Sequence, residues 1–123
     1  MKIIECNERV QGNKVLTYKL TRSPETQTMK TLVDQRIDVS NYCLYEDEKA
    51  DKDGVIKTNL ILSVMTRQGE TFATNSQTFI REFGDVTDIF GEDLSPDDGY
   101  IPIKVIQGVS KNDRKFISCC YAD

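Results

Sequence analysis

The sequence predicts a single, mostly β domain: an antiparallel sheet with one helix between its later strands and a hairpin at the C-terminus. Several runs alternate apolar and polar residues with a period of two, and one later segment has the helical period instead. Clusters of turn residues separate these segments. With 123 residues, the chain fits one domain spanning residues 1–123.

The first half of the chain contains two predicted strands. Lys14–Leu20 alternates as a half-buried strand does, and the polar segment Arg22–Met29 follows as a loop or an edge hairpin. The second strand is Arg36–Tyr45, which an acidic segment and an Asp53-Gly54 turn separate from the next one. Its predicted faces are Ile37, Val39, Asn41, Cys43 and Tyr45 on one side and Asp38, Ser40, Tyr42 and Leu44 on the other.

The most β-like run is Val55–Met65, and a turn leads from it into a short strand at Thr71–Thr74. The period then changes, which predicts a helix over residues 77–90 with Asn75 or Ser76 as its N-cap and Gly91 after its last turn. Its apolar stripe is Phe79, Phe83, Val86 and Phe90, with Ile80 and Ile89 beside it. The last two strands, Tyr100–Gln107 and Lys115–Tyr121, form a hairpin around the polar turn Gly108–Arg114.

This order of elements suits a small barrel whose open end is plugged by a helix. The oligonucleotide/oligosaccharide-binding (OB) barrel is the common version of that architecture. A helix packed on one face of an open sheet is the structural alternative.

The residue types argue against catalysis. The chain has no histidine, so it lacks the commonest general base and the Ser-His and Cys-His nucleophile pairs. Neither a Gly-rich phosphate loop before a helix nor a metal-ligand spacing is present. We therefore expect a binding domain that is not an enzyme, with no cofactor and no catalytic or metal-binding residue.

The four cysteines are predicted to be reduced. Cys6 and Cys43 are isolated, and Cys119 and Cys120 are adjacent, a distribution unlike the framework of a disulfide-rich secreted domain. The favoured interpretation makes them small core hydrophobes, and a late-formed disulfide is the alternative. The sequence has no apolar run of membrane-spanning length and no apolar signal segment at its N-terminus. A cytoplasmic protein without membrane contact is expected, in the host cytoplasm if a phage encodes it.

The net charge of −4 is unevenly distributed along the chain. Glu46–Asp53 contributes −3 and Glu92–Asp98 contributes −4, which leaves the rest of the chain at +3. The acidic total therefore excludes a uniformly basic surface but leaves room for a basic groove.

Aromatic and cationic residues on the strands are the candidate contacts for nucleic acid, because unpaired bases stack on rings and phosphates attract Lys and Arg. Lys57 and Asn59 share a semi-polar face of the central strand with Ile61, Ser63 and Met65, which suits a ligand surface or an ordinary solvated face. The other face is predicted to be core and consists of Ile56, Leu60, Leu62 and Val64. Alternation places Tyr42 and Tyr45 on opposite sides of their strand unless a bulge intervenes. The final hairpin adds Lys104, Lys111, Arg114 and Lys115, with Phe116 and Tyr121 nearby.

Several segments give the chain a resemblance to a known family. They are RIDVSNYCLY (36–45) with the acidic loop after it, TNLILSV (58–64) leading into RQGETFAT, DVTDIFG (85–91), and YIPIKVIQGVSKNDRKFISC (100–119). In these segments the chain resembles the single-stranded DNA-binding proteins of the protein-primed Bacillus phages. The resemblance implies an OB barrel that coats displaced single strands during replication, with tyrosines in contact with DNA. By this resemblance, Tyr42 and Tyr45 are the tyrosines expected to contact DNA. The first 30 residues contribute little to the resemblance.

The predicted function is accordingly single-stranded DNA binding for a phage or mobile element, with little sequence preference. Self-association along the DNA and contact with replication proteins are further partners that this interpretation allows. The main alternative is a protein–protein interaction module, such as a phage-encoded inhibitor of a host protein, because acidic loops suit a basic partner. A structural component of a virion is a third class.

Overall fold

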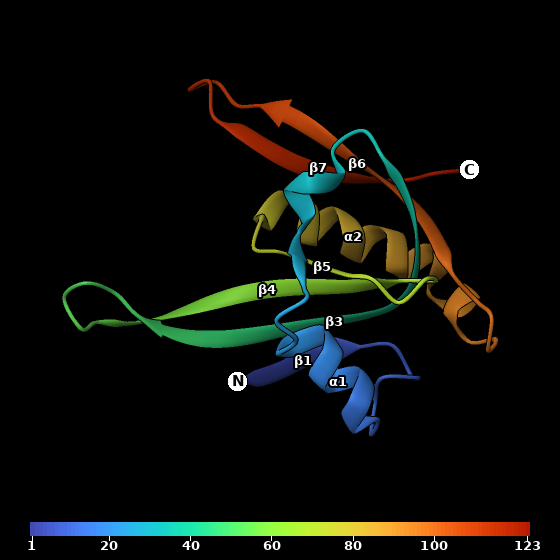
Figure 1. Cartoon of the computed structure of the whole chain (residues 1–123). Helices are drawn as coiled ribbons and strands as arrows, with labels where there is room; N and C mark the ends of the chain where they lie inside the picture. The colour runs from blue at the N-terminus through green and yellow to red at the C-terminus, as the bar shows by residue number, and fades with distance from the viewer.

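A computed structural model describes all 123 residues as one curled sheet of seven strands with two α-helices (Figure 1). The helices are α1 (Lys14–Thr21) and α2 (Gln77–Phe90), and two short 3₁₀ helices cover Met29–Leu32 and Gly91–Leu94. The strands are β1 (Lys2–Cys6), β2 (Gln27–Thr28), β3 (Arg36–Ala50), β4 (Ile56–Thr66), β5 (Thr71–Thr74), β6 (Ile101–Val109) and β7 (Lys115–Tyr121).

The sheet is antiparallel except for one short pair. Its strand order is β2-β5-β4-β3-β6-β7, with β1 paired to β3, and only β2 and β5 run parallel. Strands β2 and β7 lie at opposite ends of this order, and the sheet is curled into a half-barrel, with a single parallel bridge from Val33 to Val105 of β6 (Figure 1). The antiparallel sheet and the C-terminal hairpin are confirmed, whereas the sequence predicted one helix where the structure has two.

The predicted helix over residues 77–90 is α2. The hydroxyl of Ser76 accepts a hydrogen bond from the Phe79 N–H at 3.3 Å, so Ser76 is the N-cap. Gly91 follows the last turn but stays in the right-handed helical region, and the chain continues into a 3₁₀ turn. The predicted stripe turns Phe79, Phe83 and Val86 into the core, because a step of three or four residues keeps them on one face.

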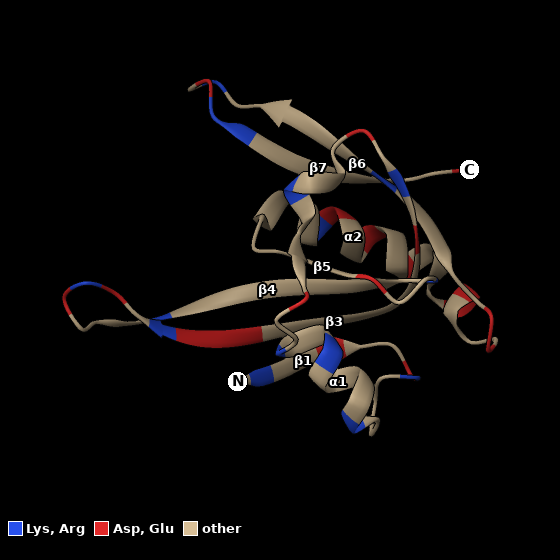
Figure 2. Ribbon diagram, viewed as in Figure 1, with Lys and Arg blue, Asp and Glu red and all other residues tan.

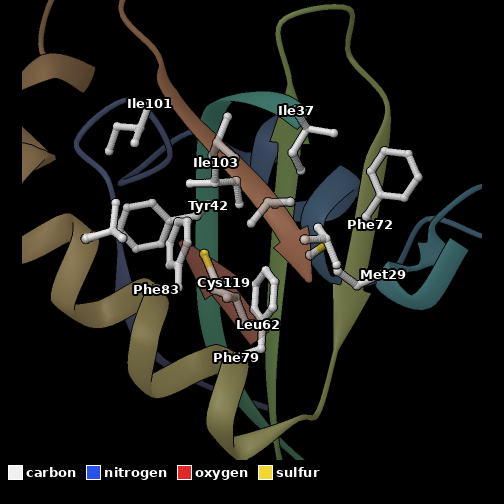
Figure 3. Packing of buried hydrophobic residues seen from close by; sticks show 14 of the residues in the cluster. Met29, Ile37, Tyr42, Leu62, Phe72, Phe79, Phe83, Ile101, Ile103 and Cys119 are labelled. Atoms are coloured by element: carbon white, nitrogen blue, oxygen red, sulfur yellow. The ribbon is translucent and has the colours of Figure 1, made fainter. Parts of the chain in front are cut away.

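The main core fills the space between α2 and the hollow side of the sheet (Figures 1 and 3). Tyr42 meets Phe83 edge to face, with ring centroids 5.3 Å apart. Residues from most of the strands surround these rings, among them Ile37 and Val39 of β3 and Ile103 of β6. This burial of large apolar side chains supplies most of the free energy that holds the helix to the sheet.

The prediction of a strand at Lys14–Leu20 is wrong, because this segment is helix α1. Leu16 and Leu20 are four residues apart and contact a second core cluster, while Val15 and Tyr18 are exposed. The Asn13 side chain accepts a hydrogen bond from the Leu16 N–H at 3.1 Å and caps the helix. The residue types of this segment alternate as in a strand, but the residues that contact the core lie four positions apart, as in a helix.

The second core cluster lies across the sheet from the main core and corrects the prediction for the central strand. Ser63 and Met65 were assigned to a solvated or ligand-binding face, but both are buried. The N-terminal segment covers them, so β3 and β4 bury side chains on both faces. The cluster consists of Val10, Leu20, Cys43, Tyr45 and Met65, with Cys6, Leu16 and Ile61 packed against it.

A β-bulge at Ser40 changes the alternation along β3. Val39 lies opposite Thr66 and Asn41 lies opposite Met65, so Ser40 is an extra residue. Its hydroxyl donates to the carbonyl oxygens of Met65 and Thr66 at 3.2 and 3.1 Å. Because of the bulge, Tyr42 shares the main core with Val39, contrary to the predicted faces of this strand.

Polar side chains anchor the N-terminal segment to the rest of the fold. The Asn7 amide donates to Asn41 Oδ1 at 2.9 Å, and Asn7 Oδ1 accepts from the Tyr42 N–H at 2.9 Å. Arg9 donates to the carbonyl oxygens of Ser40, Pro96 and Gly99 at 3.0 to 3.1 Å and also to that of Leu94. These contacts hold the chain just after strand β1, which was not predicted from the sequence and which pairs with β3.

Helix α2 also supplies polar partners to the outer edge of β7. The Ser76 hydroxyl donates to the Ile117 carbonyl at 3.1 Å, and the Glu82 carboxylate accepts from the Cys119 N–H at 3.3 Å. Two backbone groups of this end strand are thus satisfied by side chains instead of by another strand.

Candidate nucleic-acid interface

The β6–β7 hairpin carries six of the ten residues proposed from the sequence, with Tyr121 at the end of β7. Lys104 lies on β6, Lys115 and Phe116 lie on β7, and Lys111 and Arg114 lie in the turn between the strands. In the register of the hairpin, Lys104 is opposite Cys120 and Gly108 is opposite Phe116. The grouping follows from their closeness in sequence and from the hairpin fold.

The four cations of this hairpin are free to contact a ligand. Lys104, Lys111, Arg114 and Lys115 are all exposed, and none of them forms an ion pair. Figure 2 shows positive charge at the projecting end of the hairpin, where Asp113 is the single acidic residue, whereas Lys104 lies toward the other end, opposite Cys120. Exposed, unpaired cations attract the phosphates of a nucleic-acid backbone.

Phe116 lies directly over the backbone of Gly108. A Cβ atom at position 108 would lie 2.4 Å from Cζ of the Phe116 ring, so only glycine permits this approach. The ring is partly exposed. Since the glycine backbone supports one side of the ring, Phe116 is a partly accessible aromatic platform beside the cations.

A cavity of about 240 Å³ opens beside this ring. It is lined by Lys30 from the first 3₁₀ helix, Val33, and Gln107, Lys115, Phe116 and Ile117 from the hairpin. Two ammonium groups, an amide and a ring are the groups that hold a phosphate and a base. Sequence reasoning missed Lys30 and Gln107. Lys30 lies far from the hairpin in sequence, and the structure alone brings it there.

The hairpin turn is held by its own hydrogen bonds. The Ser110 N–H donates to the Arg114 carbonyl at 2.9 Å, and the Ser110 hydroxyl accepts from the Arg114 N–H at 3.2 Å. Asp113 has a φ of 56°, in the left-handed region that Asp and Asn tolerate best after glycine. These contacts fix the turn that carries Lys111 and Arg114.

The two tyrosines proposed as DNA contacts are buried on opposite faces of β3. Tyr42 is 8% exposed in the main core and Tyr45 is 5% exposed in the second cluster. Burial raises the pKa of both hydroxyls, and each donates a hydrogen bond, Tyr42 to Glu5 at 3.3 Å and Tyr45 to the Thr21 carbonyl at 3.4 Å. Neither ring is accessible to a base in this structure, because side chains of the fold occupy the space around it.

Tyr121 also packs within the fold. Its ring stacks on Phe90 of α2, with centroids 3.9 Å apart and an angle of 6° between the planes. This contact secures the end of β7 against the helix. Tyr121 lies on β7 like Lys115 and Phe116, but one face of its ring is already occupied by Phe90.

Lys57 and Asn59 lie on the projecting part of the β3–β4 hairpin, away from the β6–β7 hairpin (Figure 1). Lys57 is 3.7 Å from the Asp51 carboxylate, and Asn59 is opposite Asp47, which forms an ion pair with Arg22 at 2.7 Å. Ile56, predicted to face the core, is 66% exposed on the same hairpin. Figure 2 shows the acidic residues of β3 in this region.

A second, acidic groove of about 500 Å³ lies between β1 and the C-terminal end of α2. Four carboxylates line it, those of Glu5, Glu8, Asp88 and Glu92, and none of them has an ion-pair partner. Tyr42 and Cys6 contribute to its wall. The groove repels phosphate, which separates it by charge from the cavity beside Phe116.

Comparisons with known proteins leave the family of this chain open. No protein-family model, no curated protein and no solved structure matches it significantly. Neither helix of the structure has the length and apolar character needed to cross a membrane.

Proposed function

We propose that the protein binds single-stranded DNA for a phage or mobile element, coating displaced strands with little sequence preference. The observation that carries the proposal is the β6–β7 hairpin, which carries four unpaired cations and the partly exposed ring of Phe116, with Lys115 beside the ring. Cations would hold the phosphates, and the ring would stack on one base for about 1–3 kcal/mol. Such contacts do not distinguish one base from another, which accounts for the expected low sequence preference.

The order of the strands supports an OB-type fold for this function. Strands β3 to β7 are arranged as β5-β4-β3-β6-β7, with α2 between β5 and β6. An OB fold has this connectivity, with its helix after the third of five strands. The loop between its fourth and fifth strands, which corresponds to residues 110–114, is one of the loops that contact oligonucleotides. The family resemblance of residues 36–121 points to the same fold and ligand.

One feature departs from the usual OB binding mode. The outer face of the second and third strands often binds the oligonucleotide, but here the N-terminal segment covers that face of β4 at Ser63 and Met65. The proposal therefore assigns the DNA to the β6–β7 hairpin and the cavity shared with Lys30.

Fluorescence anisotropy with labelled oligo-dT and a duplex of equal length tests the proposal. We expect binding of oligo-dT at roughly 50 mM salt, weakening steadily as salt rises because bound counterions are released. Equal binding of the duplex, or no binding of either DNA at this salt, would contradict single-stranded DNA as the ligand.

The acidic groove favours a second candidate function, a protein–protein interaction module such as an inhibitor of a host protein. Its four unpaired carboxylates suit a basic protein surface, because complementary charge steers association. Pull-down from a nuclease-treated host lysate separates the two functions. A protein partner would remain bound after nuclease treatment, whereas material bound through nucleic acid would be lost.

A further inference from the structure

We propose that Cys6 and Cys43 form a reversible disulfide that fastens strand β1 to strand β3. The two residues are directly opposite in the antiparallel register of these strands, and both are free thiols in this structure. This site is independent of nucleic-acid binding.

The register provides the geometry that a disulfide requires. Opposite residues in an antiparallel pair have Cα atoms about 4.5–5.5 Å apart and side chains on the same face. A disulfide joins Cα atoms that are about 4.4–6.8 Å apart, so the bond can form with little backbone movement. Cys43 belongs to the second core cluster and Cys6 packs against that cluster, which places both side chains on its side of the sheet.

The two thiols differ in accessibility in a way that sets the order of reaction. Cys6 is partly exposed and lines the acidic groove, whereas Cys43 is fully buried. A small disulfide in solution can therefore reach Cys6, and Cys43 is held next to it for the second step. Cys119 and Cys120 are adjacent in β7 and point to opposite faces of the sheet, so they do not form an equivalent pair.

The proposed co-reactant is a low-molecular-weight disulfide such as glutathione disulfide. The Cys6 thiolate attacks one of its sulfurs and releases one glutathione thiolate, which leaves a mixed disulfide on the protein. The Cys43 thiolate then attacks the Cys6 sulfur and releases the second glutathione. The two protein thiols lose two electrons and two protons, and glutathione disulfide is reduced to two glutathione molecules.

The local environment makes this reaction slow at neutral pH. Burial and the neighbouring Glu5 carboxylate raise the pKa of the Cys6 thiol, and burial raises the pKa of Cys43 to about 11. Since the thiolate is the attacking species, the rate should rise about tenfold per pH unit in the range below the pKa of Cys6. The dithiol is thus stable to brief exposure and oxidises during prolonged exposure or at alkaline pH.

Oxidation would tie down the N-terminal segment. Strand β1 is joined to β3 by four registered residue pairs, and the new bond would close a loop of roughly 35 residues. A cross-link that closes a loop of this length lowers the conformational entropy of the unfolded chain. The thermal unfolding midpoint should therefore rise by roughly 10 °C. Amide hydrogens of β1 and α1 should exchange more slowly in the oxidised protein.

The test uses the full chain, incubated with glutathione disulfide at about pH 8 and then alkylated under denaturing conditions. We expect alkylation of Cys119 and Cys120 alone, with a cross-linked Cys6–Cys43 peptide in the non-reduced digest that dithiothreitol removes. The C120S variant is the matched control and should oxidise like the wild type, whereas C6S should not form the cross-link. Alkylation of all four cysteines, or a stable glutathione adduct at Cys6, would overturn the proposal and leave the DNA-binding proposal unaffected.

Discussion

The two long hairpins of this protein have the same backbone architecture and opposite surface chemistry. The β3–β4 hairpin is acidic on the outer part of β3, and two of its carboxylates are engaged in the Arg22–Asp47 and Lys57–Asp51 ion pairs. The β6–β7 hairpin has four unpaired cations and a supported aromatic ring. The comparison shows that a net charge of −4 says little about ligand preference, because one hairpin can retain a local positive surface while the other is acidic.

The largest effect of a substitution is expected where β3 enters the core. Tyr42→Ala removes a buried ring that meets Phe83, so the free energy of unfolding should fall by about 3–5 kcal/mol. Urea denaturation measures this change. The folded fraction of the variant should still bind oligo-dT like the wild type. A selective loss of binding with unchanged stability would instead make Tyr42 a DNA contact.

The next largest effect is expected from removing the positive charge of the β6–β7 hairpin. The triple variant K111A/R114A/K115A should bind oligo-dT roughly 100-fold more weakly, and the slope of log affinity against log salt should become shallower by about 2. Anisotropy titrations over a range of salt concentrations measure both quantities.

The matched control is K49A/K52A/K57A on the acidic β3–β4 hairpin. It removes the same number of positive charges and should change the affinity much less. If the two triple variants lost affinity equally, net charge and not the hairpin would determine binding.

A smaller effect is expected for the single aromatic ring. Phe116→Ala should weaken oligo-dT binding by about 1–3 kcal/mol, because stacking on one base is lost while the cations remain. The salt dependence should stay the same, which distinguishes this variant from the triple variant. Phe116→Tyr should retain most of the affinity, and equal loss in both variants would argue against stacking.

The smallest effect is expected for the ion pair at the base of the acidic hairpin. The Arg22 guanidinium lowers the pKa of the Asp47 carboxyl below its ordinary range. The pair therefore stabilises the fold at pH values above the ordinary pKa of an aspartate, and this stabilisation is lost as the pH falls through the lowered pKa of Asp47. Because both groups are partly exposed, Asp47→Asn should cost less than about 1 kcal/mol at pH 7. Denaturation midpoints should show the difference shrinking toward pH 2, and a constant difference would exclude the ion pair as its source.

The sequence predicted best those features that depend on neighbouring residues. The capped apolar stripe defines α2 from end to end, and Lys111, Arg114 and Lys115 lie together because they are close along the chain. Helix α1 was not predicted because its eight residues fit both the strand period of two and the helical period of about 3.6. Asn13, just before it, is a typical N-cap residue and could have indicated a helix.

The remaining features depend on contacts across the fold. The bulge at Ser40 has no signature in its residue type, yet it decides that Tyr42 packs against α2. Lys30 joins the cavity beside Phe116 only through tertiary structure. The burial of Ser63 and Met65 depends likewise on the N-terminal segment, whose residues far away in sequence cover β4.

The contact between α2 and β7 has a consequence for how this protein behaves at high concentration. An open sheet ends in a strand whose free amide and carbonyl groups can recruit a strand of a neighbouring molecule and start aggregation. Ser76 and Glu82 already occupy the Ile117 carbonyl and the Cys119 amide, so an incoming strand would have to displace both. The side chains of Ser76 and Glu82 thus oppose the pairing of a second molecule with this edge of the sheet.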